Sequence, residues 1–238
     1  MKTLIIIPAF NEEKSILNVY NSITNYNKKN KTNYDVIVIN DGSTDNTEKI
    51  LKENNIPHVN LIKNIKIGGS VQTGYKYAKE KGYDIAIQFD GDGQHDINYV
   101  KDIIDPISSK KANMVIGSRF IDKNSSSFKS SKSRRIGISI ISFVIKLITG
   151  KKIYDTTSGF RAIDKQLIEY FSNKYPAEYP EPVSTTEILK KGYEISEVPV
   201  SMNERKSGIS SIRAWKNVYY MINVVLSIII VGIGRKNK

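Results

Sequence analysis

Residues 85–96 read Ile-Ala-Ile-Gln-Phe-Asp-Gly-Asp-Gly-Gln-His-Asp, an apolar run that gives way to two aspartates set between glycines. Alternate side chains of an extended segment face the same side, so Asp90 and Asp92 can converge on one cation. Carboxylate and amide oxygens suit Mg²⁺ or Mn²⁺, and Mg²⁺ commonly binds substrate phosphates as well. The stretch therefore predicts a metal–diphosphate site at a strand end. A polar turn with an aspartate as helix cap is the alternative, because such turns are rich in Asp and Gly.

Other parts of the chain share this pattern of an apolar strand followed by a polar loop. Nearly continuous apolar strands that alternate with helices indicate a parallel α/β sheet with right-handed crossovers. Ligands of such sheets lie at the carboxyl ends of the strands, so we expect the polar loops to meet at one edge. The expected strands are 3–7, 36–39, 59–62, 85–89 and 114–117, and the polar loops are 8–13, 40–45, 68–70 and 90–96. We also expect Asn11 to be the N-cap of the first helix.

The composition limits the classes of function. The chain has 238 residues and no cysteine, which excludes disulfides and thiolate metal sites and fits a reducing compartment. With only two histidines, His58 and His95, a histidine-rich metal centre is excluded, and we expect His95 to be structural. The net charge of +12 indicates an anionic partner, such as nucleic acid, a phosphorylated substrate or an anionic membrane face, and a compositional bias toward Lys and Asn on exposed faces is the alternative. No nucleic-acid partner is expected, because helix-turn-helix, RNP-like and zinc-finger patterns are absent from the sequence.

The second half of the chain ends in a strongly apolar stretch at 218–233. A spanning helix needs about 20 apolar residues, so this run is marginal. Aromatic residues precede it and basic residues flank both ends, which favours a helix that lies in an anionic interface. We therefore expect a catalytic domain at 1–212 and a membrane-associating helix with a basic tail at 213–238. A helix packed on the sheet is the alternative, but it should carry a polar stripe, and hardly any is present.

Three motifs taken in chain order resemble the signatures of family 2 glycosyltransferases with the GT-A fold. They are Pro-Ala-Phe-Asn-Glu-Glu at 8–13, Asn-Asp-Gly-Ser-Thr-Asp at 40–45 and Asp-Gly-Asp-Gly-Gln at 90–94. The last motif, with Gly-Ser-Arg-Phe at 117–120, resembles the dolichyl- and polyprenyl-phosphate sugar synthase branch. The resemblance covers residues 2–212. It implies a nucleotide-sugar-binding, Rossmann-like α/β fold with a mostly parallel sheet flanked by helices.

The resemblance also implies roles for individual positions, with Mg²⁺ or Mn²⁺ as the cofactor. The positions that match metal ligands are Asp90, Asp92 and Gln94, and those that match catalytic residues at the donor diphosphate are Asp92 and Arg205. The positions that match the nucleotide-sugar site are Pro8, Ala9, Asn11, Glu12, Asp41, Gly68, Asp90 and Arg205. The positions that match a site for the acceptor's phosphate are Arg119, Arg134, Arg135 and Ser139. A solvated basic loop is the alternative for Arg134 and Arg135.

The nucleophile decides the mechanism. A lipid phosphate is already anionic and can attack the anomeric carbon without a base, whereas a sugar hydroxyl needs a carboxylate within hydrogen-bond reach. Glu178 and Glu181 fall where many members of the family carry an acidic base, which leaves room for a hydroxyl acceptor. The basic loop at 122–135, the matching arginines and the apolar tail favour the lipid phosphate.

We therefore predict a metal-dependent inverting glycosyltransferase at the cytoplasmic face of the cell membrane. It would move a sugar from a nucleoside-diphosphate sugar, with a UDP-sugar favoured, to polyprenyl (undecaprenyl) phosphate for the synthesis or modification of cell-envelope polysaccharide. The alternatives are a hydroxyl-directed transferase that extends a lipid-linked or surface polysaccharide, with Glu181 or Glu178 as base, and a catalytically idle scaffold. Larger members of the family carry further membrane helices and this sequence ends at Lys238, so we expect a small membrane protein as a partner.

Overall fold

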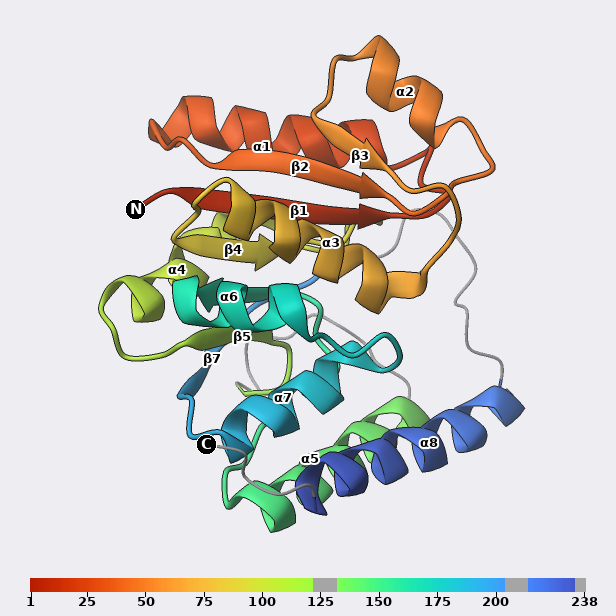
Figure 1. Cartoon of the computed structure of the whole chain (residues 1–238), viewed down its shortest axis with the longest axis vertical. Helices are drawn as coiled ribbons and strands as arrows, with labels where there is room; N and C mark the ends of the chain where they lie inside the picture. The colour runs from red at the N-terminus through yellow and green to blue at the C-terminus, as the bar shows by residue number, and fades with distance from the viewer. Residues whose placement is uncertain (122–131, 204–213, 234–238) are drawn as a thin grey trace.

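The computed structural model describes residues 1–121, 132–203 and 214–233, with the backbone alone for 132–134 and 214–220. Its strands are β1 (Thr3–Ala9), β2 (Asp35–Asn40), β3 (His58–Asn60), β4 (Ile85–Gln88), β5 (Met114–Ser118), β6 (Arg161–Asp164) and β7 (Ile195–Pro199). They form one sheet in the order β3-β2-β1-β4-β6-β5-β7 (Figure 1). The five strands expected from the first half of the sequence are all present, and β3 is shorter than expected.

One strand of this sheet runs against its neighbours. The strands from β3 to β4 are mutually parallel, and β5 is parallel to β7, but β6 is antiparallel to both β4 and β5. Arg161, the first residue of β6, pairs with Gln88 at the end of β4 and with Ile116 of β5. The residues that precede β6 therefore lie at the carboxyl edge of the sheet, together with the polar loops.

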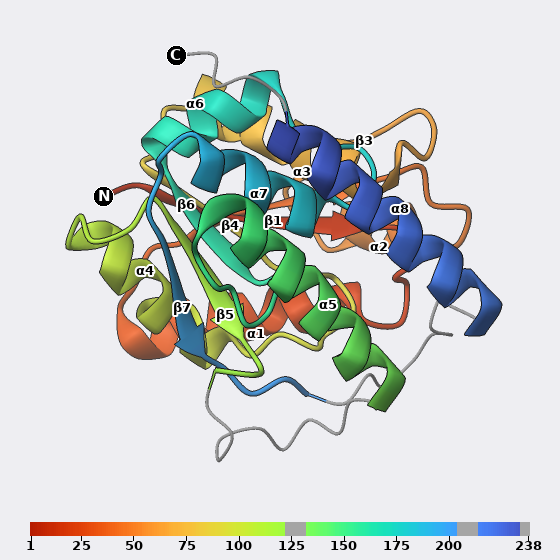
Figure 2. The same ribbon diagram turned by 90° about the horizontal axis from the view of Figure 1, so that it is seen from below.

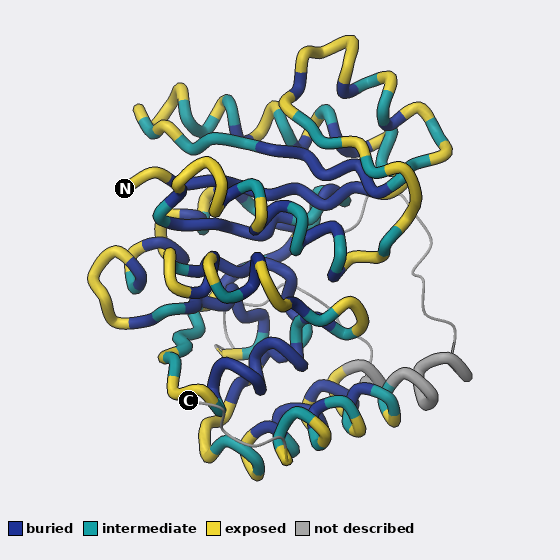
Figure 3. The backbone as a smooth tube through the Cα atoms, in the orientation of Figure 1, coloured by how far each residue is buried: buried dark blue, intermediate teal, exposed yellow. Residues whose placement is uncertain are grey.

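Helices cover both faces of the sheet. They are α1 (Ile16–Asn30), α2 (Thr47–Glu53), α3 (Lys66–Glu80), α4 (Val100–Ser108), α5 (Lys132–Thr149), α6 (Lys165–Asn173), α7 (Pro180–Lys190) and α8 (Ala214–Ile233), with a 3-10 turn at Ile97–Tyr99. The alternation of β1 shows how the two layers form: Leu4 and Ile6 join the core under α3 and α6, whereas Ile5 and Ile7 join the core under α1 and α4. Figure 3 shows the resulting buried central strands.

The apolar C-terminal stretch forms α8, which packs beside α5 and against α7 (Figure 2). A Cβ on Gly137 would lie 3.0 Å from the sulfur of Met221, and one on Gly232 would lie 2.6 Å from Ile148, so the two helices run in the same direction at close range. Val224 of α8 is fully buried in the core. Within the described residues, no helix combines the length and hydropathy needed to cross a membrane. The division of the chain at residue 212 stays a prediction.

The expected helix cap at Asn11 is wrong. Helix α1 begins at Ile16, and Ser15 occupies the N-cap position. Asn11 instead has a positive φ of 57°, and its side-chain oxygen accepts a hydrogen bond of 2.8 Å from the backbone N–H of Thr44. The physical reason is a tertiary contact: a hydrogen bond joins the polar loop after β1 to the polar loop after β2, which the sequence spacing alone does not reveal.

Candidate active site

The ends of three parallel strands surround a polar cavity of about 360 Å³. Its walls come from the loops after β1, β2 and β4 and from the first turns of α3. The described residues that line it are Pro8, Ala9, Phe10, Glu12, Asp41, Asn64, Lys66, Ile67, Ser70, Asp90, Gly91 and Asp92. The polar loops therefore meet at one edge of the sheet, as the strand pattern predicts. We call this space the acidic cavity.

Asp41 organises the wall between β2 and α3. Its carboxylate accepts a hydrogen bond of 2.8 Å from the backbone N–H of Ile65, immediately before α3. Burial raises the pKa of the Asp41 carboxyl, and hydrogen bonds from the backbone oppose this shift. Gly68, in the first turn of α3, approaches another segment closely: a Cβ there would lie 2.1 Å from the carbonyl oxygen of Pro176. The segment that carries Glu178 and Glu181 is thereby held beside this cavity.

Asp90 is oriented by the buried ring of His95. The backbone N–H of Asp90 donates to Nδ1 of His95 at 3.0 Å, so the imidazole proton is on Nε2, which lies 3.4 Å from an Asp90 carboxylate oxygen. Burial lowers the pKa of His95, although the charge of Asp90 opposes the shift. The ring also stacks on Phe160 with a centroid distance of 4.8 Å. His95 thus has the structural position that the sequence suggested, packed behind a predicted metal ligand.

Gly159 also approaches Asp90 closely. A Cβ at this glycine would lie 2.8 Å and 2.9 Å from the two carboxylate oxygens of Asp90. The side-chain amide of Gln88 donates to Asp90 at 3.3 Å and also lies within hydrogen-bonding reach of the Glu181 carboxyl. Among the described residues, the buried side-chain oxygen of Gln88 has no hydrogen-bond partner.

Glu181 and Glu178 lie in different surroundings. Burial raises the pKa of the Glu181 carboxyl, the charge of Arg161 opposes that shift, and the charge of Asp90 adds to it. Glu178 is exposed and forms an ion pair with Lys66 at the rim of the acidic cavity. Of the two glutamates, Glu181 is therefore the one positioned close to Asp90.

A buried arginine fixes the segment that leads to Gly159. Arg161 donates to the backbone oxygens of Ser158 and Thr156 at 2.6 Å and 3.2 Å. It also donates to the backbone oxygen of Glu181 at 2.9 Å and to the hydroxyl of Thr185 at 2.9 Å. These neutral oxygens satisfy a cation that is almost completely removed from water. They join the residues before β6 to the first turn of α7.

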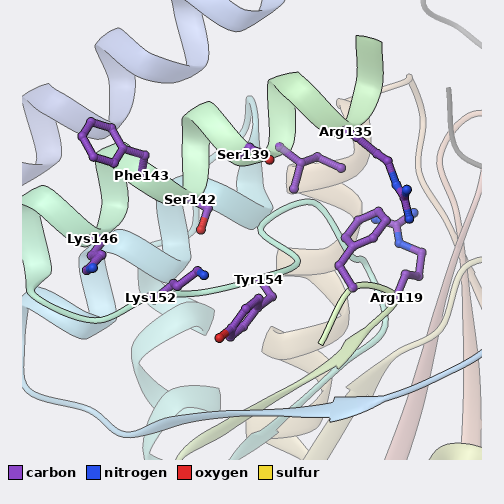
Figure 4. A pocket seen from close by; sticks show the side chains of 10 residues that line it. Arg119, Arg135, Ser139, Ser142, Phe143, Lys146, Lys152 and Tyr154 are labelled. Carbon is purple, nitrogen blue, oxygen red and sulfur yellow. The ribbon is translucent and has the colours of Figure 1, made fainter. Parts of the chain in front are cut away.

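A second cavity, of about 710 Å³, lies along α5 (Figure 4). It combines basic, hydroxyl, aliphatic and aromatic side chains, so it can surround an anionic group with a hydrocarbon attached. The described residues that line it are Arg119, Phe120, Arg135, Ile138, Ser139, Ser142, Phe143, Lys146, Lys152 and Tyr154. We call this space the basic cavity.

Arg119 enters the basic cavity as part of a buried ion pair. Its guanidinium donates to both carboxylate oxygens of Asp155 at 2.7 Å, and to the hydroxyl of Thr157 at 3.0 Å. Asp155 is in turn held by Glu197, which accepts hydrogen bonds from the backbone N–H groups of Tyr154 and Asp155 at 2.7 Å and 2.8 Å. The direction of the Arg119 fork is thus set before any ligand binds.

The family model for Glycosyl transferase family 2 matches residues 4–171, well over half of the chain. The chain belongs to this family. The match includes both predicted carboxylates, the loops around the acidic cavity and the segment from Asp155 to Gly159.

Two relatives and one solved structure show what the chain is similar to. A UDP-N-acetylglucosamine–dolichyl-phosphate N-acetylglucosaminyltransferase of Methanococcus voltae is 37% identical over 216 residues, covering 82% of this chain and 83% of that protein. A polyprenol monophosphomannose synthase of Mycolicibacterium smegmatis is 24% identical over 219 residues, covering 88% and 80%. Glucosyl-3-phosphoglycerate synthase from Mycobacterium tuberculosis, solved with Mn²⁺, UDP-glucose and phosphoglyceric acid, aligns with a TM-score of 0.73 at 16% identity, over 99% of this chain and 81% of that one. That likeness confirms the expected α/β GT-A fold.

The site residues that the family resemblance predicted fall into four groups in the structure. The acidic cavity brings together Pro8, Ala9, Glu12, Asp41, Asp90 and Asp92, with Asn11 and Gly68 in the supporting contacts described above. The basic cavity brings together Arg119, Arg135 and Ser139. Gln94 is not among the described lining residues, although its backbone N–H donates to Asp92 at 3.0 Å. Arg205 and the side chain of Arg134 lie outside the described residues. The functional roles of all these residues stay predictions.

The acidic cavity suits a metal that shares its ligands with a substrate. Within the described part of the chain, no three His, Cys, Asp or Glu side chains gather as a group that could hold a metal ion. Asp90 and Asp92 nevertheless line one cavity, and Gly159 leaves the Asp90 carboxylate its room. Mg²⁺ is commonly held by one or two carboxylates plus substrate phosphates, which is a donor set that these two residues fit.

The sequence did not reveal residues whose role depends on contacts formed only in the folded chain. Asp155 and Gly159 carry no motif of their own, and each acts through a residue distant in the chain, whereas Gln88 contacts Asp90 only two positions away. Lys152 and Tyr154 of the basic cavity were also missed. A signal was present in the turn at 156–160, because a glycine close to the start of a strand permits close approach of another side chain.

Proposed function

We propose that this family 2 enzyme transfers a sugar from a UDP-sugar to polyprenyl phosphate at the cytoplasmic face of a membrane, with Mg²⁺ or Mn²⁺ as cofactor. The Methanococcus relative is named for UDP-N-acetylglucosamine and dolichyl phosphate, so N-acetylglucosamine is the first donor sugar to test. The mycobacterial relative is likewise named for a polyprenol monophosphate sugar. The absence of cysteine from the sequence suits a reducing compartment.

The observation that carries the proposal is that one short segment contacts a lining residue of each cavity. Asp155 holds Arg119 in the basic cavity, and Gly159 closes on Asp90 in the acidic cavity. Four residue steps separate these positions, a span of at most about 14 Å for extended chain. A donor diphosphate in one cavity and an acceptor phosphate in the other would therefore lie within reach of each other.

The chemistry of this arrangement needs no proton transfer from the acceptor. Arg135 and Ser139 would bind the acceptor's phosphate, with Arg119 held in place by Asp155. A phosphate oxygen attacks the anomeric carbon, the bond from that carbon to the diphosphate oxygen breaks, and the diphosphate leaves with the electron pair. A bound divalent metal would offset the charge that develops on this leaving group. Attack opposite the leaving group inverts the anomeric centre.

The outer surfaces of α5 and α8 support a membrane location. Each helix exposes one apolar stripe at helical spacing: Ile136, Ile140, Phe143 and Leu147 on α5, and Ile222, Leu226, Ile230 and Ile233 on α8. These side chains are between 47% and 79% exposed. Because the two helices lie side by side and in parallel, the stripes form an apolar surface next to the basic cavity, of the kind that marks membrane contact.

A hydroxyl acceptor is the second candidate, and one observation favours it. Glu181 lies close to Asp90 and burial raises its carboxyl pKa, which is a common property of a general base. The unpartnered side-chain oxygen of Gln88 could accept a hydrogen bond from a sugar hydroxyl in either case. The two candidates differ in whether ionised Glu181 is needed for turnover.

The test is a transfer assay with matched acceptors. The full chain is incubated with Mn²⁺ and a labelled donor, UDP-N-acetylglucosamine first, then UDP-glucose and GDP-mannose. The acceptors are a polyprenyl phosphate and the polyprenol of the same length, which differ only in the phosphate. We expect a labelled lipid from the phosphate alone, with no product after chelation of the metal. The absence of a labelled lipid with every donor would refute the proposal.

Two variants separate the acceptor classes. Arg135→Ala should raise the KM for polyprenyl phosphate, while Glu181→Gln should retain turnover because no base is required. Loss of turnover in Glu181→Gln, together with transfer to a hydroxyl acceptor, would instead establish the second candidate.

A further inference from the structure

The basic cavity has a second cationic end that the proposed acceptor site does not use. Arg119 and Arg135 lie at one end, whereas Lys146, Lys152 and Tyr154 lie toward the other (Figure 4). Arg135 and Lys146 are eleven positions apart on α5, which corresponds to about 16 Å along the helix axis. A phosphate held by the two arginines therefore leaves the lysine end available for a different group.

The two lysines have no carboxylate partner among the described residues. The adjacent Lys151 differs, because its ammonium pairs with Glu194 on the surface. The ammonium of Lys152 instead lies 4.3 Å from the centre of the Tyr154 ring. Two unneutralised cations that line one cavity repel each other and create a local positive potential, so the lysine end attracts an anion.

The surroundings of the lysine end indicate that this anion carries a hydrocarbon chain. Lys146 lies on α5 between Phe143 and Leu147, which are 60% and 69% exposed. Phe143 lines the basic cavity and also belongs to the apolar stripe of α5, so the cavity wall continues into that apolar surface. A lysine beside such a surface can keep its stem against hydrocarbon while its ammonium binds a polar headgroup.

We infer that Lys146, Lys152 and Tyr154 form a second phosphate subsite, which binds the headgroup of an anionic membrane phospholipid. The two ammonium groups neutralise the phosphodiester, and its acyl chains lie against Phe143 and Leu147. The arginine end stays open for the phosphate of the acceptor. This inference rests on the membrane location in the proposed function, but it concerns residues and a ligand that the transfer reaction does not require.

The test measures vesicle binding in the absence of donor and acceptor. The full chain is titrated with vesicles of phosphatidylcholine alone and with vesicles that also contain phosphatidylglycerol. The variant is Lys146→Gln/Lys152→Gln, and the control is Lys101→Gln/Lys165→Gln, which removes the same charge from exposed positions of α4 and α6. We expect the cavity variant to lose roughly 30-fold in affinity for the anionic vesicles, since each lysine at an anionic surface contributes about fivefold.

The control and a competition experiment decide the result. Remote lysines are screened beyond about 8 Å at physiological ionic strength, so the control should lose much less affinity. Equal losses in both variants would overturn the inference, because they would reflect total charge alone. If inorganic phosphate weakened vesicle binding more than chloride does at equal ionic strength, the lysines would be assigned to free phosphate. That result would also overturn the inference.

A measurement on the parent chain tests the inference without relying on the folding of any variant. Short-chain phosphatidylglycerol should protect Lys146 and Lys152, but not Lys101, from acetylation as read by mass spectrometry. Uniform protection, or none, would contradict the inference. The outcome is separable from that of the transfer assay, because a chain that makes no labelled lipid can still show or lack this selective protection.

Discussion

Gly159→Ala should damage the active site while the sheet stays intact. The added methyl carbon would lie 2.8 Å from one carboxylate oxygen of Asp90, 2.9 Å from the other and 2.8 Å from the amide nitrogen of Gln88. Ordinary contacts begin at 3.4 Å, so the methyl group and the carboxylate must separate by about 0.6 Å. Because the methyl group faces both oxygens, rotation of the carboxylate does not relieve the contact.

The size of the effect follows from this displacement. A misplacement of about 1 Å at a reacting centre costs on the order of 100-fold, so we expect kcat/KM to fall roughly 10- to 100-fold. The overpacking itself should cost about 1–3 kcal/mol of folding free energy. The assay is transfer to polyprenyl phosphate over a range of Mn²⁺ concentrations, with thermal unfolding measured on the same samples.

Gly82→Ala is the matched control for Gly159→Ala. Gly82 has a φ of +69° and open space around its missing Cβ, so alanine there strains the backbone by about 1–2 kcal/mol without touching the site. We expect this variant to lose stability and to keep kcat/KM. Displacement of the Asp90 carboxylate is expected to cost far more than threefold in kcat/KM. If Gly159→Ala kept kcat/KM within about threefold of the parent, the assignment of Asp90 to the donor site would be refuted.

Three further predictions concern the supports of the two cavities. Asp155→Asn should destabilise the chain by about 3–5 kcal/mol in chemical denaturation, because it removes the carboxylate charge opposite the buried Arg119 guanidinium, and it should raise the KM of the acceptor more than that of the donor. Gly68→Ala should raise the KM of the donor roughly 10-fold or more, because its Cβ meets backbone oxygens that cannot yield, whereas Gly69→Ala meets only the flexible end of Ile65 and should be mild. Burial raises the pKa of the Glu197 carboxyl, so this group binds its proton more tightly in the folded than in the unfolded chain. The stability of the parent relative to Glu197→Gln should therefore be highest at acid pH and fall as the pH rises through the raised pKa, and the opposite trend in paired denaturation curves would contradict this assignment.

The sequence predicted the parts of the site that local patterns encode. An apolar strand followed by a polar loop is readable at β1, β2 and β4, and parallel strands place the ends of such strands at one edge. The convergence of Asp41 and Asp90 on one cavity follows from these two rules alone. The order of the motifs then indicated the family that the comparison confirmed.

The direction of β6 could not be predicted, because it depends on pairing and not on pattern. A short strand such as 161–164 can pair in either direction, and its neighbours β4 and β5 are themselves far away in sequence. The partner of Arg119 was unreadable for the same reason, since Asp155 lies 36 positions away in an irregular segment. The predicted role of Arg119 at the acceptor's phosphate stays a prediction, and the structure adds that a buried carboxylate holds this arginine.

The reversed direction of β6 is what lets one segment contact both cavities. A parallel strand between β4 and β5 would begin at the amino edge of the sheet, and the residues before it would lie far from Asp90. Because β6 begins at the carboxyl edge, the residues from Asp155 to Gly159 pass between the two predicted ligand sites. Arg161 holds this segment through hydrogen bonds to the backbone oxygens of Ser158 and Thr156. Burial of its charge costs desolvation free energy. The arrangement implies that Arg161 supports the donor and acceptor geometry in common, so a change at Arg161 should alter both KM values, whereas a change at Asp155 acts mainly on the acceptor.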